Sequence, residues 1–340
     1  MRLDSRCNQK CGFCNILGPG VHFKMDSGYV RGMLRQIALV RTDATVNFTG
    51  GEPTLRRDLI DLVTYAKAVN IKRVVLQTNA TRLADEQYAH KLANAGLDDA
   101  LVSLHSCFPE VSDTLTGAPG TWKKTVVGIQ NALRNGIPIT TNIVLTTANL
   151  DHLVDTVQFT LNSFPTLSGI ILSPLQPHGD LLNHLELLPK YSDLSTPVRQ
   201  AAELIRAADK NLYLSYCENP LCWLLDAFGV QGDNELRQYI ARRLNANECG
   251  DCHLSTMMDK DKIKPPVCDT CHLDSVCFGV WRKYVDIFGA EELKAVPIPV
   301  GGKAPKKSFS VAPHVSGQSA ADQRVALANT GLARQSSFPR

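Results

Sequence analysis

The residues with the clearest chemistry are three cysteines near the start of the chain. Cys7, Cys11 and Cys14 are spaced Cys-x-x-x-Cys-x-x-Cys, and the next Cys or His is His22. Closely spaced thiolates bind iron–sulfur clusters, and a [4Fe–4S] cubane normally takes four of them. Three thiolates therefore predict a cluster with one iron free to bind another molecule. The alternative is a zinc site completed by a distant fourth ligand.

A second motif follows the first strongly apolar run of the chain. In "NFTGGEPTL", Gly50, Gly51, Glu52 and Pro53 come directly after a strand-like segment. Two adjacent glycines allow a ligand to approach the backbone and leave N–H and C=O groups open to an amino or carboxylate group. We therefore expect this loop and the cysteine loop to face the same ligand.

The elements that must position these loops lie between about 41 and 215. Apolar runs typical of buried parallel strands occur at 44–50, 72–79, 99–105, 138–146 and 168–175. Amphipathic segments typical of helices lie between them at 55–69, 83–96, 122–136 and 150–163. Residues 1–7 provide a short first strand. The alternation predicts an α/β fold with about six βα units, with ligands at the carboxyl ends of the strands.

Together, the cysteine loop, with Phe13 before its last Cys, and Gly50-Gly51-Glu52-Pro53 resemble the radical S-adenosylmethionine (SAM) superfamily over residues 1–215. The resemblance implies a partial (β/α)6 TIM-like barrel. It also implies a [4Fe–4S] cluster whose free iron is chelated by the amino and carboxylate groups of SAM. Reductive cleavage of SAM then gives a 5′-deoxyadenosyl radical that abstracts hydrogen from a substrate.

The resemblance carries site residues over by position. Gly50, Gly51 and Glu52 are expected at the methionyl amine of SAM. The full cofactor-binding set is Phe13, Gly50, Gly51, Glu52, Pro53, Thr78, Asn79, Ser103 and Asn142. For Ser103 and Asn142, ordinary strand-end hydrogen bonding is the alternative. No catalytic residue is assigned; the polar residues expected to face the site are His105, Gln176, His178 and Asp180.

A second cysteine group follows the point, near residue 216, where the βα alternation ends. Cys268, Cys271 and Cys277 are spaced Cys-x-x-Cys-x5-Cys, and Cys222 completes four thiolates for a second, closed [4Fe–4S] cluster. This pattern resembles the twitch and SPASM domains of radical SAM enzymes. Trp281 stands where the SPASM signature has a further Cys, which favours one auxiliary cluster.

Other assignments for these cysteines stay open. Cys249 and Cys252 could join Cys268 and Cys271 in a zinc ribbon, and Cys217 has no assignment. The predicted domains are a radical SAM core at 1–215, a twitch/SPASM-like domain at 216–299 and a tail at 300–340. The tail is rich in Ala, Ser, Gly and Pro and is expected to be disordered.

Composition narrows the function classes. The 340 residues carry a net charge of +3, too small to indicate nucleic-acid binding. No apolar run approaches the ~20 residues of a membrane span, and no signal peptide is evident. We therefore expect a cytoplasmic protein. The resemblance to radical SAM enzymes implies an electron donor such as flavodoxin or ferredoxin.

The substrate is expected to be a peptide or a small molecule. The first alternative is a nucleotide reaction like that of the molybdenum-cofactor cyclase family. Two features count against it: the C-terminal cysteine spacing differs from that family's, and the final sequence does not end in Gly-Gly. The second alternative is a non-catalytic iron–sulfur or zinc protein. The Gly50 to Pro53 loop counts against it, because such a scaffold needs no SAM site.

Overall fold

The computed structural model describes residues 1–16, 20–208, 211–214, 219–227, 261–274, 277 and 279–297. Cys217, Cys249 and Cys252 lie outside these ranges, and so does the predicted tail at 300–340. The zinc-ribbon alternative therefore involves residues beyond the described part. The domain boundaries at 215 and 299 stay predictions.

Six parallel strands form one sheet in the order β1-β2-β3-β4-β5-β6. The strands are β1 Thr45–Phe48, β2 Arg73–Thr78, β3 Asp99–Ser103, β4 Ile139–Leu145, β5 Gly169–Pro174 and β6 Asn211–Leu214. Each strand pairs with the next strand along the chain, as in a (β/α) barrel that is not closed. This confirms the α/β fold with six parallel strands.

The predicted first strand at 1–7 is wrong. Arg2 forms only an isolated parallel bridge with Thr49, and Asp4 an isolated antiparallel bridge with Lys24. The sixth strand is instead β6, at the other end of the sheet. The N-terminal residues bridge the end of β1 and then turn into the cysteine loop, so they cannot extend along β1 as a strand does.

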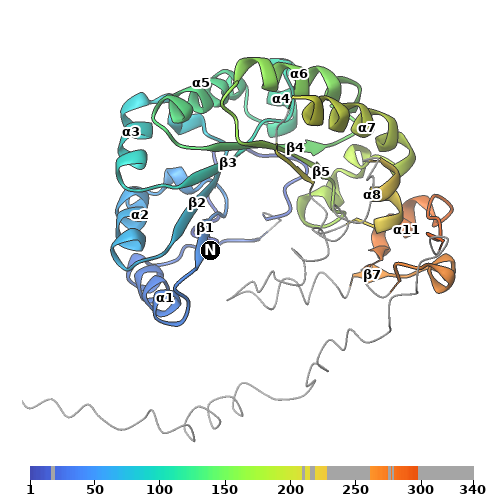
Figure 1. Ribbon diagram of the computed structural model, residues 1–340, viewed down its shortest axis with the longest axis horizontal. Helices are drawn as coiled ribbons and strands as arrows, with labels where there is room; N and C mark the ends of the chain where they lie inside the picture. Colours follow the sequence, from blue (N-terminus) through green and yellow to red (C-terminus); the bar gives the residue numbers. More distant parts are fainter. Residues whose placement is uncertain are drawn as a thin grey trace, which may run out of the picture. The chain divides into compact units, whose positions relative to one another are not determined.

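Helices connect the strands and lie along one side of the sheet (Figure 1). Those of the barrel are α1 Ser27–Val40, α2 Leu59–Ala68, α3 Glu86–Asn94, α4 Pro109–Thr116, α5 Thr121–Arg134, α6 Leu153–Ser163 and α7 Tyr191–Ala207. Gly96 (φ 91°) and Gly136 (φ 76°) end α3 and α5 in the left-handed conformation, as expected of helix C-cap glycines.

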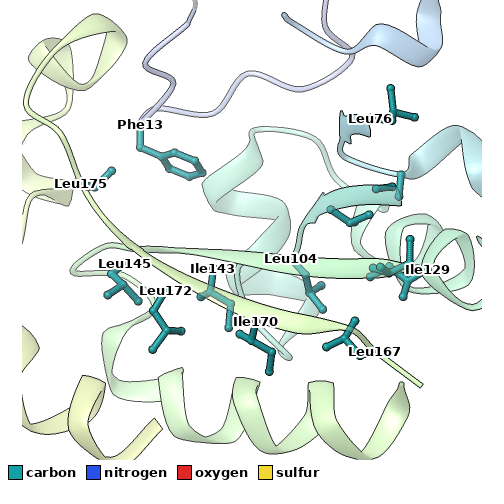
Figure 2. Packing of buried hydrophobic residues seen from close by; sticks show 14 of the residues in the cluster. Phe13, Leu76, Leu104, Ile129, Ile143, Leu145, Leu167, Ile170, Leu172 and Leu175 are labelled. Atoms are coloured by element: carbon teal, nitrogen blue, oxygen red, sulfur yellow. The ribbon is translucent and has the colours of Figure 1, made fainter. Parts of the chain in front are cut away.

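The strands present alternate residues to two different environments, because successive side chains of a strand point to opposite faces. Ile143, Leu145, Ile170 and Leu172 are fully buried. Figure 2 shows Leu145, Ile170 and Leu172 pointing from β4 and β5 toward the helices, with Phe13 on the other side of these strands. The opposite face of the sheet is therefore left for a ligand.

The described C-terminal part consists of short elements. It contains α8 Leu221–Ala227, the antiparallel pair β7 Lys262–Ile263 and β8 Val280–Trp281, and α11 Arg282–Phe288. Aromatic contacts join it to the start of α7. Tyr191 stacks on Tyr284 with ring centroids 4.3 Å apart, and Trp223 Nε1 donates to the Tyr191 carbonyl at 2.9 Å.

Candidate cluster and cofactor site

The cysteine loop is bonded directly to the Gly-Gly-Glu-Pro loop at the end of β1. The Gly51 N–H donates to the Asp4 carbonyl at 2.7 Å, and the Glu52 N–H donates to the Arg6 carbonyl at 2.8 Å. A Cβ at Gly50 would clash with the Asp4 carbonyl, and one at Gly51 with that of Arg6. These two N–H groups, expected to be open to a ligand, therefore bind the chain that leads into the cysteine loop.

Glu52 is a buried carboxylate that joins the ends of β1 and β2. Oε1 accepts from the Thr54 N–H at 2.9 Å, the Thr54 hydroxyl at 2.6 Å and the Thr78 hydroxyl at 2.7 Å. Oε2 accepts from the Asn79 N–H at 2.7 Å. Burial raises the pKa of Glu52 above its usual range, and these hydrogen bonds oppose that shift.

Asn79 extends this network to the cysteine loop. Its Nδ2 donates to Asn8 Oδ1 at 2.8 Å, and its Oδ1 accepts from the Thr81 hydroxyl at 2.8 Å. Asn8 Nδ2 in turn donates to Thr81 Oγ1 at 2.8 Å. Thr78 and Asn79, expected to touch SAM, thus hold the two loops together. Sequence reasoning did not find Asn8 or Thr81; the available signals were the place of Asn8 between Cys7 and Cys11 and that of Thr81 shortly after β2.

Other loops hold the far side of the cysteine loop. The Lys10 N–H donates to the Thr116 carbonyl at 2.7 Å, and Gln9 Nε2 donates to Thr121 Oγ1 at 3.2 Å. The Asp180 N–H donates to the Cys14 carbonyl at 2.9 Å. Five separate segments of the barrel thus fix the positions of the three thiols.

A cavity of about 720 Å³ lies between the cysteine loop and the carboxyl ends of the strands. Ligand pockets of roughly 300–1,000 Å³ are usual. The predicted site residues that line it are Cys7, Cys11, Phe13, Cys14, Gly50, Gly51, Glu52, Thr78, Asn79, Ser103 and Asn142. Pro53 does not line it, because this residue begins a buried 3-10 turn at 53–55.

The thiols at this cavity need a positive partner. Burial raises the pKa of the Cys7 thiol to about 11, and it raises that of Cys11 as well. The Gln9 N–H donates to Cys7 Sγ at 3.4 Å, as backbone N–H groups do around cluster sulfurs. Three thiols on one loop, all lining the cavity, fit in donor type a [4Fe–4S] cluster that keeps one iron for a further ligand.

Polar side chains from β3, β4 and β5 line the cavity opposite the thiols. Ser103 and Asn142 are paired in the β3–β4 register. Ser173 Oγ donates to Asn142 Oδ1 at 2.6 Å, which orients the Asn142 amide. Of the other residues expected to face the site, His105, Gln176 and Asp180 line the cavity. His178 is not in this lining; its ring lies 5.2 Å from that of Trp281.

The four C-terminal cysteines also share one cavity. Cys222, Cys268, Cys271 and Cys277 line a small space of about 20 Å³ with Val267, Leu273, Val280 and other mostly apolar neighbours. Burial raises the pKa of the Cys222 thiol and raises that of Cys268 to about 11. The Gly279 N–H donates to Cys277 Sγ and the Val296 N–H to Cys271 Sγ, both at 3.4 Å.

Two further findings concern the described residues as a set. Within them, no three Cys, His, Asp or Glu side chains surround a position for one metal ion. Each group of thiols therefore lines a cavity and does not enclose a site for a single ion. In the same residues, no helix is both long and apolar enough to cross a bilayer. Cys107 lines neither thiol cavity and is half-buried, not fully buried as a small apolar residue would be.

The fold and this site define a class: a partial α/β barrel with three thiols facing a cofactor cavity at its strand ends. The family model described as "Radical SAM superfamily" matches residues 3–160. A protein of Sulfurisphaera tokodaii named "Probable GTP 3′,8-cyclase" is 31% identical over 216 residues, which are 63% of this chain and 67% of that protein. The chain belongs to the radical SAM superfamily.

Two further comparisons bear on the extent of this likeness. A protein of Sulfolobus acidocaldarius, also named "Probable GTP 3′,8-cyclase", is 35% identical over 178 residues, 52% of this chain and about half (55%) of that protein. The crystal structure of Streptococcus suis SuiB bound to S-adenosylmethionine has a TM-score of 0.58 at 18% identity, over 86% of this chain and 74% of that one. At that identity the likeness to SuiB concerns the fold.

Membership of the superfamily settles the coarse function. The chain is a radical SAM enzyme, and its cofactors are a [4Fe–4S] cluster and SAM. The three-thiol loop and the cavity fit both groups in donor type and in position. The reaction requires a substrate and a reductant, as in other members of the superfamily.

Proposed function

We propose that this chain is a radical SAM enzyme of the GTP 3′,8-cyclase type, acting on a purine nucleotide. The observation that carries the proposal is the alignment with the two curated cyclases, which extends to 216 residues of this chain. This favours the alternative of the sequence analysis over its peptide reading. The substrate itself is inferred from the names of these relatives.

The extent of the cavity lining supports a second ligand beside SAM. The lining continues along β5 past the SAM region to Gln176 and Asp180. Lys10, on the cysteine loop, is the cation among the described lining residues. We place the nucleotide in the part near β4 and β5, with its phosphates toward Lys10.

When bound, the cluster and SAM supply a 5′-deoxyadenosyl radical that removes a hydrogen atom from the substrate. The protein's part is to position both ligands and to exclude water. Glu52 fixes the loop after β1 on which the methionyl amine is proposed to lie. Ser103 and the Asn142 amide, which face the cavity, are the proposed direct contacts, whereas Thr78 and Asn79 act through Glu52 and the cysteine loop.

The test is a deuterium-transfer experiment with the reconstituted enzyme. Anaerobic protein is given SAM, dithionite and GTP deuterated at the ribose 3′ carbon. Mass spectrometry then follows 5′-deoxyadenosine. We expect GTP to stimulate its formation and the deuterium to appear in it. The matched controls are unlabelled GTP, CTP and a reaction without nucleotide.

One result would exclude GTP as the substrate and leave the radical SAM assignment unchanged. If 5′-deoxyadenosine forms at the same rate with and without GTP and carries no deuterium, the cyclase proposal is wrong. A protein that forms no 5′-deoxyadenosine under any condition would instead indicate an unloaded N-terminal cluster, which iron analysis and the EPR spectrum check directly.

A second [4Fe–4S] cluster is proposed in the C-terminal cavity. Four thiols around one apolar space, two of them accepting backbone N–H groups, support a cluster ligated by protein alone. With no iron left open, that cluster would not bind SAM or substrate directly. Its proposed roles are to stabilise this part of the chain or to relay electrons.

The same four thiols are the specific observation that favours a second candidate function, peptide modification. They resemble the twitch and SPASM domains of peptide-modifying radical SAM enzymes more than the cyclase spacing. Here the test is to repeat the assay with a short peptide encoded beside the gene. Peptide-dependent 5′-deoxyadenosine together with a mass change of the peptide would favour this candidate over the nucleotide.

A further inference from the structure

His105 is a buried side chain of the cofactor cavity to which no role has yet been given. It stands two residues beyond the end of β3, on the same face as Ser103, and only 2% of it is exposed. Its ring nevertheless lines the cavity. Phe13 packs edge-on against it, with ring centroids 4.9 Å apart, so the cysteine loop meets β3 at this residue.

A backbone donor fixes the tautomer of His105. The Val144 N–H of β4 points at His105 Nδ1 at 3.3 Å. A backbone amide can only donate, so Nδ1 must be the acceptor and the ring proton must lie on Nε2. Burial lowers the pKa of His105 to about 4, so the ring is neutral at physiological pH and cannot act there as an acid.

The opposite edge of the ring has a donor to offer. Among the described residues, no side chain or carbonyl accepts from His105 Nε2, and this nitrogen is absent from the enclosed polar atoms that lack a partner. The neighbouring polar groups of the floor can donate as well, through the Ser103 hydroxyl and Asn142 Nδ2, while Asn142 Oδ1 already accepts from Ser173. A ligand bound in this part of the cavity is therefore expected to present hydrogen-bond acceptors.

The ligand nearest this position is SAM. SAM would have to reach the cluster held by Cys7, Cys11 and Cys14, and His105 packs against Phe13, the residue before Cys14. The methionyl end is placed at the loop after β1. Neighbouring strands lie about 4.8 Å apart, so β3 is roughly 10 Å from β1, which is the direction in which the adenosyl group must extend.

We propose that His105 is a SAM-positioning residue whose Nε2–H donates to a ring nitrogen or ribose oxygen of the adenosyl group. The contact is made by a fixed, neutral donor, so it orients the adenosyl group without changing its charge. It requires SAM alone, and it therefore stands or falls independently of the nucleotide substrate.

The test compares His105→Phe, which keeps the ring shape and loses the donor, with His105→Gln, which keeps a donor on a shorter side chain. His90→Gln, at an exposed site on α3, is the control. Each reconstituted protein is titrated with SAM by equilibrium dialysis. The loss of one neutral hydrogen bond predicts about 3- to 10-fold weaker binding in His105→Phe and partial recovery in His105→Gln.

Two additional probes separate positioning from a structural role. Binding of 5′-deoxyadenosine should weaken in His105→Phe by a similar factor, whereas binding of methionine, followed through the cluster EPR signal, should not change. Unaltered SAM affinity in His105→Phe would overturn the proposal. So would an equal loss for SAM, 5′-deoxyadenosine and methionine, which would mean that the whole cavity had been disturbed.

Discussion

The two cysteine regions place the same side chain in opposite surroundings. At the N-terminal loop, three thiols face a cavity of about 720 Å³ with polar groups on its floor. In the C-terminal region, four thiols line a space of only about 20 Å³ among mostly apolar neighbours. The first arrangement leaves both an iron and room for a ligand, and the second leaves neither. The number of thiols and the polarity of the walls change together.

This difference indicates why the cofactor site lies at the carboxyl ends of the strands. The N-terminal thiols are held by backbone hydrogen bonds from several βα loops, which also form the walls of the ligand cavity. The C-terminal thiols come from short elements outside the sheet, so their surroundings contain no row of strand ends. A reactive site needs the first setting, whereas a closed cluster can use the second.

The largest effect is expected when the N-terminal cysteines are removed, because only their cluster is expected to cleave SAM. Replacing Cys7, Cys11 and Cys14 by Ala should abolish SAM cleavage, because no protein ligand remains for the open cluster. Iron should fall from about eight to about four per chain, since each cubane holds four irons. Unchanged 5′-deoxyadenosine formation in this variant would contradict the assignment of SAM cleavage to the N-terminal cluster.

The reciprocal variant tests the closed cluster. Cys268→Ala with Cys271→Ala should also lower iron to about four per chain, while the SAM-dependent change in the EPR spectrum persists. The matched control is Cys107→Ala, because Cys107 lines neither cavity. Loss of one zinc instead of four irons would mean that the C-terminal thiols form a zinc site.

A smaller effect is expected at a glycine that touches the first region. Gly179 has φ 67°, and a Cβ there would lie 2.6 Å from the Cys14 carbonyl. Gly120 has φ 78° with open space around it. Both changes to Ala should cost about 1–2 kcal/mol of backbone strain. Only Gly179→Ala should also reduce iron loading of the N-terminal loop, measured in the C-terminal double variant.

An effect of similar size is a pH dependence that belongs to the first region. Burial lowers the pKa of His105 from 6.5 to about 4. The unfolded chain therefore takes up a proton as pH falls below about 6.5, and the folded chain does not until about pH 4. The free energy of unfolding should fall by about 2 kcal/mol between pH 7 and pH 5 from this residue.

Urea unfolding of the wild type and His105→Gln at both pH values isolates that contribution, since the difference between the two proteins removes effects common to both. Tyr191 and Tyr284, buried beside the C-terminal thiols, do not interfere, because burial moves both pKa values upward and away from this range. An equal acid response in the two proteins would contradict the assignment to His105.

Much of the barrel could be predicted from the sequence because its central strands carry buried apolar residues at alternate positions and lie between amphipathic helices. The errors lie at the two edges. Residues 1–7 contain only two strongly apolar positions and turn into a loop, and Asn211–Leu214 is four residues long. Short edge segments carry too few residues for their pattern to be distinguished from a loop.

At the site, the residue types could be predicted but not their partners. Gly50 and Gly51 were expected to admit a ligand, and the structure shows that the chain at Asp4 to Arg6 takes up the N–H groups of Gly51 and Glu52. Thr78 and Asn79 were placed at SAM, yet their hydrogen bonds go to Glu52 and Asn8. Which donor meets which acceptor depends on contacts between segments far apart in the sequence.

The hydrogen bonds around the cysteine loop also set an order of events during synthesis. The three thiols are synthesised before most of their partners, because the loop that carries them takes its shape from residues near 50, 80, 120 and 180. At ~5–20 residues per second, translation from Cys14 to Asp180 takes roughly 8–33 seconds. Iron delivered to the nascent chain before then would meet three unorganised thiols, so loading of this cluster must follow folding of most of the barrel.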